Sequence, residues 1–284
     1  MAHTLKSLFA KHPDNAPAIG APGREWMTYG ELKSLSQDVR KILRSAGIGA
    51  TERVAIVLPN GPEMAAAFVT VAQSATTAPL NPAYKEEEFA FYLEDLKACA
   101  IILEAGYTGP ARSAAQRFDM SVIELHPAAK AGQFTLTTET IGAAEDCEPQ
   151  ADDIALILHT SGTTSRPKIV PLLQSNIAAS AQNIQKSLAL TPDDCCLNVM
   201  PLFHIHGLIA AVTASLAAGA SISCAPGFDA LKFYGWLEDV NPSWYTAVPT
   251  MHQAILARAP RNLDIIQNAR LRLLRSSSSS LPAA

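Results

Sequence analysis

The chain has 284 residues, of which 48% are hydrophobic and 17% charged, so it can bury one large core or two modest ones. This composition excludes a disordered or fibrous protein. The formal net charge of −4 is spread without a basic stripe or arm, which argues against nucleic acid as the main partner. A small anionic ligand would therefore need local positive groups.

Cysteine usage and apolar runs bear on the compartment. The five cysteines show no CxxC spacing, which suits buried thiols in a reducing compartment better than disulfides or a zinc site. The N-terminus lacks the apolar stretch of a signal peptide, and the apolar segment 208–220 is short enough to be a buried helix. We expect a soluble cytoplasmic protein with no membrane span. A peroxisomal location stays open for a eukaryotic source, because a C-terminal targeting signal would lie beyond Ala284.

The first well-marked helix follows Thr28. Thr28 and Glu31 have the spacing of a capping box, in which the hydroxyl accepts from a free N–H of the first turn and the carboxylate reaches back. Apolar residues then recur at helical spacing from Leu32 to Leu43, and Gly47 stands where a left-handed residue would end the helix.

Apolar strand-like runs then alternate with helix-like segments. Uniformly apolar runs of this kind are typical of strands covered on both faces by helices. We therefore predict an α/β fold with mostly parallel sheets flanked by helices. The predicted strands are 54–58, 100–103, 122–125, 154–158, 196–199, 221–224, 244–247 and 271–274, and the predicted helices are 63–73, 86–97, 111–118, 175–188, 206–218, 230–240 and 250–258.

A stretch rich in Thr, Ala and acidic residues, 132–153, is the best candidate for a surface connection. It divides the chain into two predicted α/β subdomains, 1–150 and 151–284. The second subdomain carries the segment HTSGTTSRPKIVPL, residues 159–172, directly behind a predicted strand.

This segment gathers short hydroxyl side chains around one glycine. A bound triphosphate needs several converging donors, which the amides of a Gly-containing turn and small hydroxyls supply. Gly162 lets the backbone turn, Pro167 stiffens the exit and Lys168 adds a charge. It is not a Walker A loop, and composition alone also fits a Ser/Thr-rich surface turn. The candidate phosphate-binding residues are Thr160, Ser161, Gly162, Thr163, Thr164, Ser165 and Lys168.

The order TSGTTSRPK, residues 160–168, resembles the phosphate loop of adenylate-forming enzymes, the superfamily of acyl-CoA synthetases, nonribosomal adenylation domains and luciferases. The usual form has Gly in place of Ser165 and Ile169, and the first departure resembles the branch around oxalate-CoA ligase. Ile169 would be strained at positive φ and harmless in an extended strand. The strand-like pattern of Val170 and Leu172 favours the extended strand.

NVMPLFHIHGLIAA, residues 198–211, resembles the next family motif, in which a strand end delivers an aromatic residue and a histidine to the acyl pocket. The resemblance implies pocket roles for Phe203 and His206 and a catalytic role for His204, which would shape the junction of acyl group and nucleotide. Without the resemblance, such histidines are more often satisfied core or N-cap residues.

Two later stretches resemble other walls of the family's site. PSWYTAVPTMHQAIL, residues 242–256, resembles a wall of the acyl pocket, although core packing explains its aromatic pair equally well. LRLLRSSSSSL, residues 271–281, resembles the segment that flanks adenine and the acyl carboxylate, whereas a serine run alone predicts a flexible linker. The residues implied are Tyr245, Thr246, Pro249, His252, Arg275, Ser276, Ser277, Ser278, Ser279 and Ser280.

The resemblance implies an AMP-forming acid-CoA ligase that uses ATP, Mg²⁺ and coenzyme A. The carboxylate would attack the α-phosphate to give acyl-AMP and pyrophosphate, and the CoA thiolate would then displace AMP. Lys168 would be catalytic by stabilising phosphate charge as pyrophosphate leaves. No residue is assigned as a metal ligand, and the oligomeric state is left open.

A short diacid such as oxalate fits the polar side chains best, because its second carboxylate would be costly to bury without partners such as His206, His252 and Arg275. A medium-chain or aromatic acid is the alternative. The family's Tyr-Gly-x-Thr-Glu and Thr-Gly-Asp motifs and its C-terminal domain with a catalytic Lys have no counterpart here. We therefore expect an N-terminal fragment that is not competent alone, with a non-catalytic nucleotide-binding or interaction module as the alternative.

Overall fold

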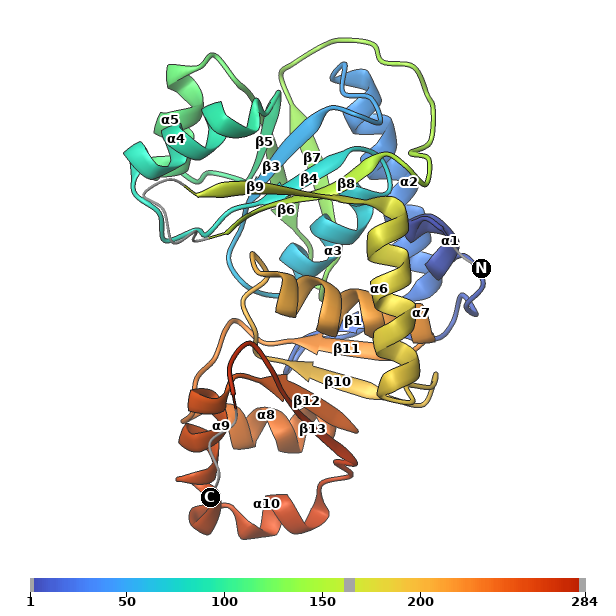
Figure 1. Cartoon of the computed structure of the whole chain (residues 1–284), viewed down its shortest axis with the longest axis vertical. Coiled ribbons are helices and arrows are strands. Elements are labelled where there is room, and N and C mark those ends of the chain that lie inside the picture. The colour runs from blue at the N-terminus through green and yellow to red at the C-terminus, as the bar shows by residue number, and fades with distance from the viewer. Residues whose placement is uncertain (1–2, 161–166, 281–284) are drawn as a thin grey trace.

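The structure is a computed structural model that describes residues 3–160 and 167–280. Two mostly parallel sheets flanked by helices form its framework, which confirms the predicted fold class (Figure 1). The seven-stranded sheet has the order β7 (Phe134–Thr138), β6 (Ser121–Pro127), β5 (Ala100–Glu104), β3 (Arg53–Val57), β4 (Thr76–Pro79), β8 (Ile154–Thr160) and β9 (Lys168–Leu173). The six-stranded sheet has the order β13 (Leu273–Ser276), β12 (Trp244–Ala247), β10 (Cys195–Asn198), β11 (Ser221–Cys224), β1 (Pro17–Gly20) and β2 (Met27–Thr28).

Helices cover the faces of these sheets, and the helix predicted after Thr28 is confirmed. The Thr28 amide donates to Glu31 Oε2 at 2.8 Å, and Thr28 Oγ1 accepts from the Glu31 amide at 3.3 Å. Gly47 has φ +78°, as its predicted capping role requires. In chain order the helices are α1 (Leu5–Phe9), α2 (Tyr29–Ser45), α3 (Pro62–Ala72), α4 (Glu86–Leu96), α5 (Pro110–Arg117), α6 (Gln174–Ser187), the π-helical η1 (His206–Thr213), α7 (Ala214–Ala218), α8 (Phe233–Val240), α9 (Pro249–Leu256), the 3₁₀ turn η2 (Ala259–Arg261) and α10 (Leu263–Asn268).

Helix α3 lies between the two sheets and contacts strands of both (Figure 1). All of its residues except Glu63 are buried. A helix that is apolar on every face must be enclosed on every face, and its small side chains let both sheets approach closely. The largest core cluster therefore runs through α3 from one sheet to the other.

The segment predicted as one buried helix, 206–218, is buried throughout but begins as the π-helix η1 and continues as α7. The Thr213 hydroxyl donates to the Leu208 carbonyl at 2.8 Å, which satisfies an acceptor of the widened turn. Within the described part of the chain, no helix combines the length and apolar character needed to cross a membrane.

The prediction of 132–153 as a surface connection is wrong for its first part, because Phe134–Thr138 forms β7, antiparallel to β6. Phe134 and Leu136 are buried while Thr135 faces solvent, so this edge strand has one polar face and resembles a loop in composition. The subdomain division at 150/151 stays a prediction. The sheets do not follow it, because β8 and β9 complete the first sheet while β1 and β2 join the second.

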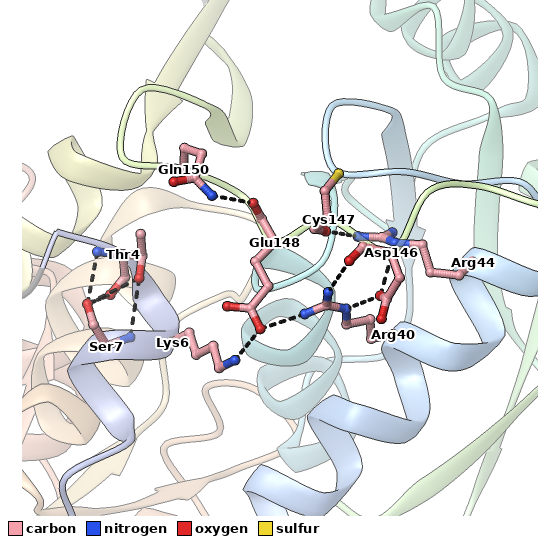
Figure 2. Close-up of polar contacts among 9 residues, drawn as sticks. All are labelled: Thr4, Lys6, Ser7, Arg40, Arg44, Asp146, Cys147, Glu148 and Gln150. Atoms are coloured by element: carbon pink, nitrogen blue, oxygen red, sulfur yellow. Dashed lines mark hydrogen bonds and ion pairs between the residues drawn. The ribbon is translucent and has the colours of Figure 1, made fainter.

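The segment 145–150, the strap, runs over α1 and α2 before it enters β8 (Figure 2). Arg40 Nη1 contacts Glu148 at 2.8 Å, and Glu148 also pairs with Lys6. Arg40 Nε lies 2.5 Å from Asp146. The carboxylates of these pairs are exposed, so each pair contributes little individually. The buried Arg44 ties the strap down more firmly, since it donates to the Cys147 carbonyl at 2.8 Å and to the Ser74 carbonyl at 2.9 Å.

The prediction of buried thiols holds for Cys195, Cys196 and Cys224, which are buried and free. Burial raises the pKa of the Cys224 thiol to about 12, so this group stays protonated. Cys99 and Cys147 are free but exposed, which corrects the prediction for these two.

Asp194 links the N-terminal ends of three parallel strands. Its Oδ1 accepts from Ser243 Oγ at 2.6 Å and from Arg272 Nε at 2.8 Å, while Oδ2 accepts from Arg272 Nη2 at 2.7 Å. These residues directly precede β10, β12 and β13. Burial alone would raise the pKa of Asp194, but hydrogen bonds from Arg272, Ser243 and the Thr191 amide outweigh it and hold the pKa well below the usual range.

Replacing Asp194 with Ala is expected to lower the free energy of unfolding by about 3 kcal/mol at pH 7, because Ser243 and Arg272 lose their hydrogen-bond acceptor. Urea denaturation measures this change. The exposed neighbour Asp193 provides the control, since Asp193→Ala should stay within about 0.5 kcal/mol of wild type. Equal losses in the two variants would contradict the role given to Asp194.

Candidate functional site

The predicted phosphate loop joins two antiparallel strands. Thr160, at the end of β8, and Lys168, at the start of β9, are register partners, and both are exposed. Strand β8 pairs parallel with β4, so the hairpin projects from the carboxyl edge of the parallel strands, where ligands bind in α/β sheets. The predicted phosphate-binding residues Ser161, Gly162, Thr163, Thr164 and Ser165 lie outside the described residues.

Ile169 stands where the usual loop has glycine, and its backbone is extended. It lies in β9, paired with His159, and it is absent from the residues with positive φ in the described chain. Its side chain packs against a core cluster that includes Phe89 of α4. The predicted extended backbone at Ile169 is thus confirmed.

A second group of predicted residues meets at the carboxyl edge of the six-stranded sheet. His206 begins η1, Thr246 lies on β12 and Arg275 lies on β13. His206 Nε2 lies 2.6 Å from Thr246 Oγ1 and 2.9 Å from Arg275 Nη1. His206 Nδ1 lies 3.1 Å from Ser278 Oγ and 3.3 Å from Ser277 Oγ.

These contacts define the proton positions on His206. A guanidinium only donates, so Nε2 accepts from Arg275 and the ring proton stays on Nδ1, which faces the serine hydroxyls. Burial, followed by the charges of Arg275 and His252, lowers the pKa of His206 to about 4. At neutral pH the group therefore offers one permanent cation, Arg275, beside neutral donors. Burial also lowers the pKa of Arg275 from its usual value.

His252 supports this group through the backbone of Arg275. Its Nε2 donates to the Arg275 carbonyl at 3.1 Å, which leaves Nδ1 to accept from the Tyr245 hydroxyl at 3.2 Å. Tyr245 is buried on β12, and burial raises its pKa to about 12. Both ring nitrogens of His252 are thus engaged, so this predicted pocket residue orients β13 in this arrangement.

The remaining predicted residues lie around this edge. The exposed His204 packs on Phe203 with ring centroids 4.4 Å apart, and Phe203 lines a small hollow between the sheets with Leu58 and Leu80. Ser276 belongs to β13, and within the described chain its buried hydroxyl has no hydrogen-bond partner. Ser279 and Ser280 are exposed. Ser278 is exposed as well, but its hydroxyl and that of Ser277 contact His206.

Sequence reasoning assigned no role to two residues beside the hairpin. His159 precedes Thr160 on β8 and contacts Asp95 of α4, with 3.2 Å between His159 Nε2 and Asp95 Oδ2. His159 begins the segment HTSGTTSRPKIVPL, but no sequence signal links it to Asp95, because the two positions lie 64 residues apart.

Comparison with known proteins decides the family. Residues 6–284 match the family described as AMP-binding enzyme. The chain belongs to this family of AMP-binding enzymes. The resemblance drawn from the TSGTTSRPK segment is thereby confirmed.

Named relatives of this AMP-binding enzyme include two oxalate-CoA ligases. The protein of Arabidopsis thaliana is 37% identical, over 98% of this chain and 55% of the relative. The protein of Saccharomyces cerevisiae is 35% identical, over 82% of this chain and 47% of the relative. The ATP-bound crystal structure of MatB from Rhodopseudomonas palustris superimposes with a TM-score of 0.83 at 26% identity, over 99% of this chain and 56% of that one. The chain thus spans about half the length of these relatives.

The lowered pKa of His206 predicts a loss of stability in acid. An unfolded histidine titrates near 6.5, so as pH falls from 6.5 to 4 the unfolded chain binds a proton that the buried ring rejects. The free energy of unfolding should fall by about 3 kcal/mol across this window from this group alone. In His206→Asn, urea midpoints measured between pH 7 and pH 4 should decline less steeply than in wild type. Parallel declines would contradict the burial cost assigned to His206.

Proposed function

We propose that this chain is the nucleotide- and acid-binding part of an AMP-forming acid-CoA ligase acting on a small dicarboxylate such as oxalate. One observation carries the proposal: the TSGTTSRPK segment joins paired strand ends at the carboxyl edge of a parallel sheet. Membership of the AMP-binding family and the names of the oxalate-CoA ligase relatives support it.

The hairpin would hold the ATP phosphates. Lys168 brings an ammonium to the loop exit, and in the part of the chain that the structure describes it makes no ion pair. Thr160 and the hydroxyls of 161–165 would add neutral donors. Magnesium would arrive with ATP, and among the described residues no group of three or more His, Cys, Asp or Glu side chains is placed to hold an ion.

The reaction would proceed in two displacements. A carboxylate oxygen attacks the α-phosphorus, the bond to the bridging oxygen breaks and pyrophosphate leaves with the electron pair. Lys168 and the loop donors stabilise the charge that builds on the leaving phosphates. The CoA thiolate then attacks the acyl carbonyl and expels AMP. His204, exposed beside Phe203, would shape the junction between nucleotide and acid.

The His206 group would recognise the second carboxylate of the acid. A buried carboxylate is costly without partners, and Arg275 supplies a positive charge while His206 Nδ1–H, Ser277 and Ser278 supply hydrogen bonds. A medium-chain or aromatic acid would place apolar atoms against the Arg275 charge, so the polarity of the group favours a short diacid over that alternative.

Lys168→Ala should slow adenylation about 100-fold, since it removes a donor to the charge that builds on the leaving phosphates. Exchange of labelled pyrophosphate into ATP with oxalate measures this step. The assay should use both this chain and a version extended to the length of the relatives. Lys186→Ala, at an exposed lysine of α6, is the matched control and should leave the exchange unchanged.

Comparing the exchange activity of this chain with that of the extended version distinguishes the ligase proposal from the alternative of a non-catalytic module. Activity in the long form alone supports the acid-binding part of a ligase, and activity in neither form supports a non-catalytic nucleotide-binding module. Wild-type exchange in Lys168→Ala of an active long form would remove the phosphate role proposed for this residue.

Arg275→Leu should raise the KM for oxalate about 100-fold through the loss of one charge partner, while the KM for acetate, which has no second carboxylate, should change less than threefold. Steady-state kinetics with both acids in the long form measures the ratio. Equal effects on the two acids would show that Arg275 supports the fold and does not read the second carboxylate.

A further inference from the structure

Both strands that border the TSGTTSRPK loop are anchored on the α4 side of the sheet. On β8, the His159 side chain is 6% exposed and its Nε2 lies 3.2 Å from Asp95 Oδ2 of α4. A carboxylate only accepts, so Nε2 carries the proton. Burial lowers the pKa of His159 and outweighs the opposing effect of Asp95, so the ring is neutral near pH 7 and the contact is a neutral donor to a carboxylate.

Aromatic rings and an apolar side chain complete the anchor. Tyr92, also on α4, forms a T-shaped contact with the His159 ring with centroids 4.6 Å apart, and Tyr84 stacks on Tyr92 at 4.9 Å. Ile169, the register partner of His159, packs against the same core cluster as Tyr84 and Tyr92. The β8 side of the hairpin is thus held by a hydrogen bond and a ring contact, and the β9 side by apolar packing.

This anchor acts one residue away from the proposed phosphate contacts. Thr160 follows His159 directly, and Lys168 directly precedes Ile169. Donors stabilise developing charge only when they are held in place before the reaction, and errors of about 1 Å are costly. We propose that the His159–Asp95 pair is a positioning device that holds Thr160 and Lys168 in register for the nucleotide's β- and γ-phosphates. The inference rests on the proposed function, because it assigns that hairpin its ligand.

The proposed anchor predicts that its loss changes the affinity for ATP more than the affinity for AMP. A device that positions phosphate donors matters for ATP, which carries the β- and γ-phosphates, and hardly for AMP, which lacks them. General loosening of the fold would weaken both nucleotides alike. The ratio of the two dissociation constants therefore separates a positioning role from a merely structural one.

The test is calorimetric binding of ATP and of AMP to the chain and three variants. His159→Leu should weaken ATP about tenfold and AMP less than twofold. His159→Gln keeps an N–H donor of similar reach and should recover most of the ATP affinity. His126→Leu, at an exposed histidine that bonds Thr137 at the β6–β7 edge, should behave as wild type.

The outcomes separate the two proposals. Equal weakening of ATP and AMP in His159→Leu, or unchanged affinities in a folded variant, overturns the positioning role while the phosphate site stands. A wild-type chain that binds ATP no more tightly than AMP overturns the phosphate site itself and the inference with it. Should His159→Leu fail to fold, Asp95→Ala provides the same test, because it removes the acceptor of the His159 N–H; a selective loss of ATP affinity supports the anchor and an unchanged ratio overturns it.

Discussion

The enclosure of α3 between two sheets is the constraint on which the arrangement of this protein depends. Every residue of α3 except Glu63 is buried, and strands of both sheets contact it. A helix without a polar face cannot lie at a surface, so it forces the two sheets onto opposite sides of itself. Both sheets combine strands that are distant in sequence, since β8–β9 complete the first sheet and β1–β2 complete the second. The two candidate binding regions lie at the carboxyl edges of these sheets, so the packing of the sheets around α3 fixes where the regions lie.

The two regions have different electrostatics, suited to different ligands. The hairpin presents Lys168 and Thr160 at the surface, where a strongly hydrated triphosphate can exchange water for protein donors. In the His206 group, His206 and Thr246 are buried, and the single permanent cation is the half-buried Arg275. A second charge at His206 would be repelled by Arg275 and penalised by burial, which is why that ring stays neutral. One guanidinium with several neutral donors supports the proposal that this group binds one small carboxylate.

Ile169 departs from the usual family loop, and its side chain contributes apolar packing. The position lies in an extended strand, so glycine's access to positive φ is not needed. A β-branched side chain suits such a strand and adds apolar contact beside Tyr84 and Tyr92. The serine run is a comparable case. Ser276 ends the edge strand β13 and Ser277 and Ser278 contact His206, so part of a sequence that resembles a linker is structured.

Local patterns in the sequence determined the alternation of helices and apolar strands, the capping box at Thr28, the place of the TSGTTSRPK segment behind a strand, and several of the residues that meet around His206. Each of these depends on spacing within a few residues, which the sequence displays directly. The structure alone decided that β1 and β2 join the second sheet, that β7 is a strand, that His252 supports Arg275, and that His159 meets Asp95 across 64 positions. Edge strands carry a weak polar–apolar pattern, and contacts between distant positions depend on how the sheets pack around α3. No spacing in a single sequence reports either of them.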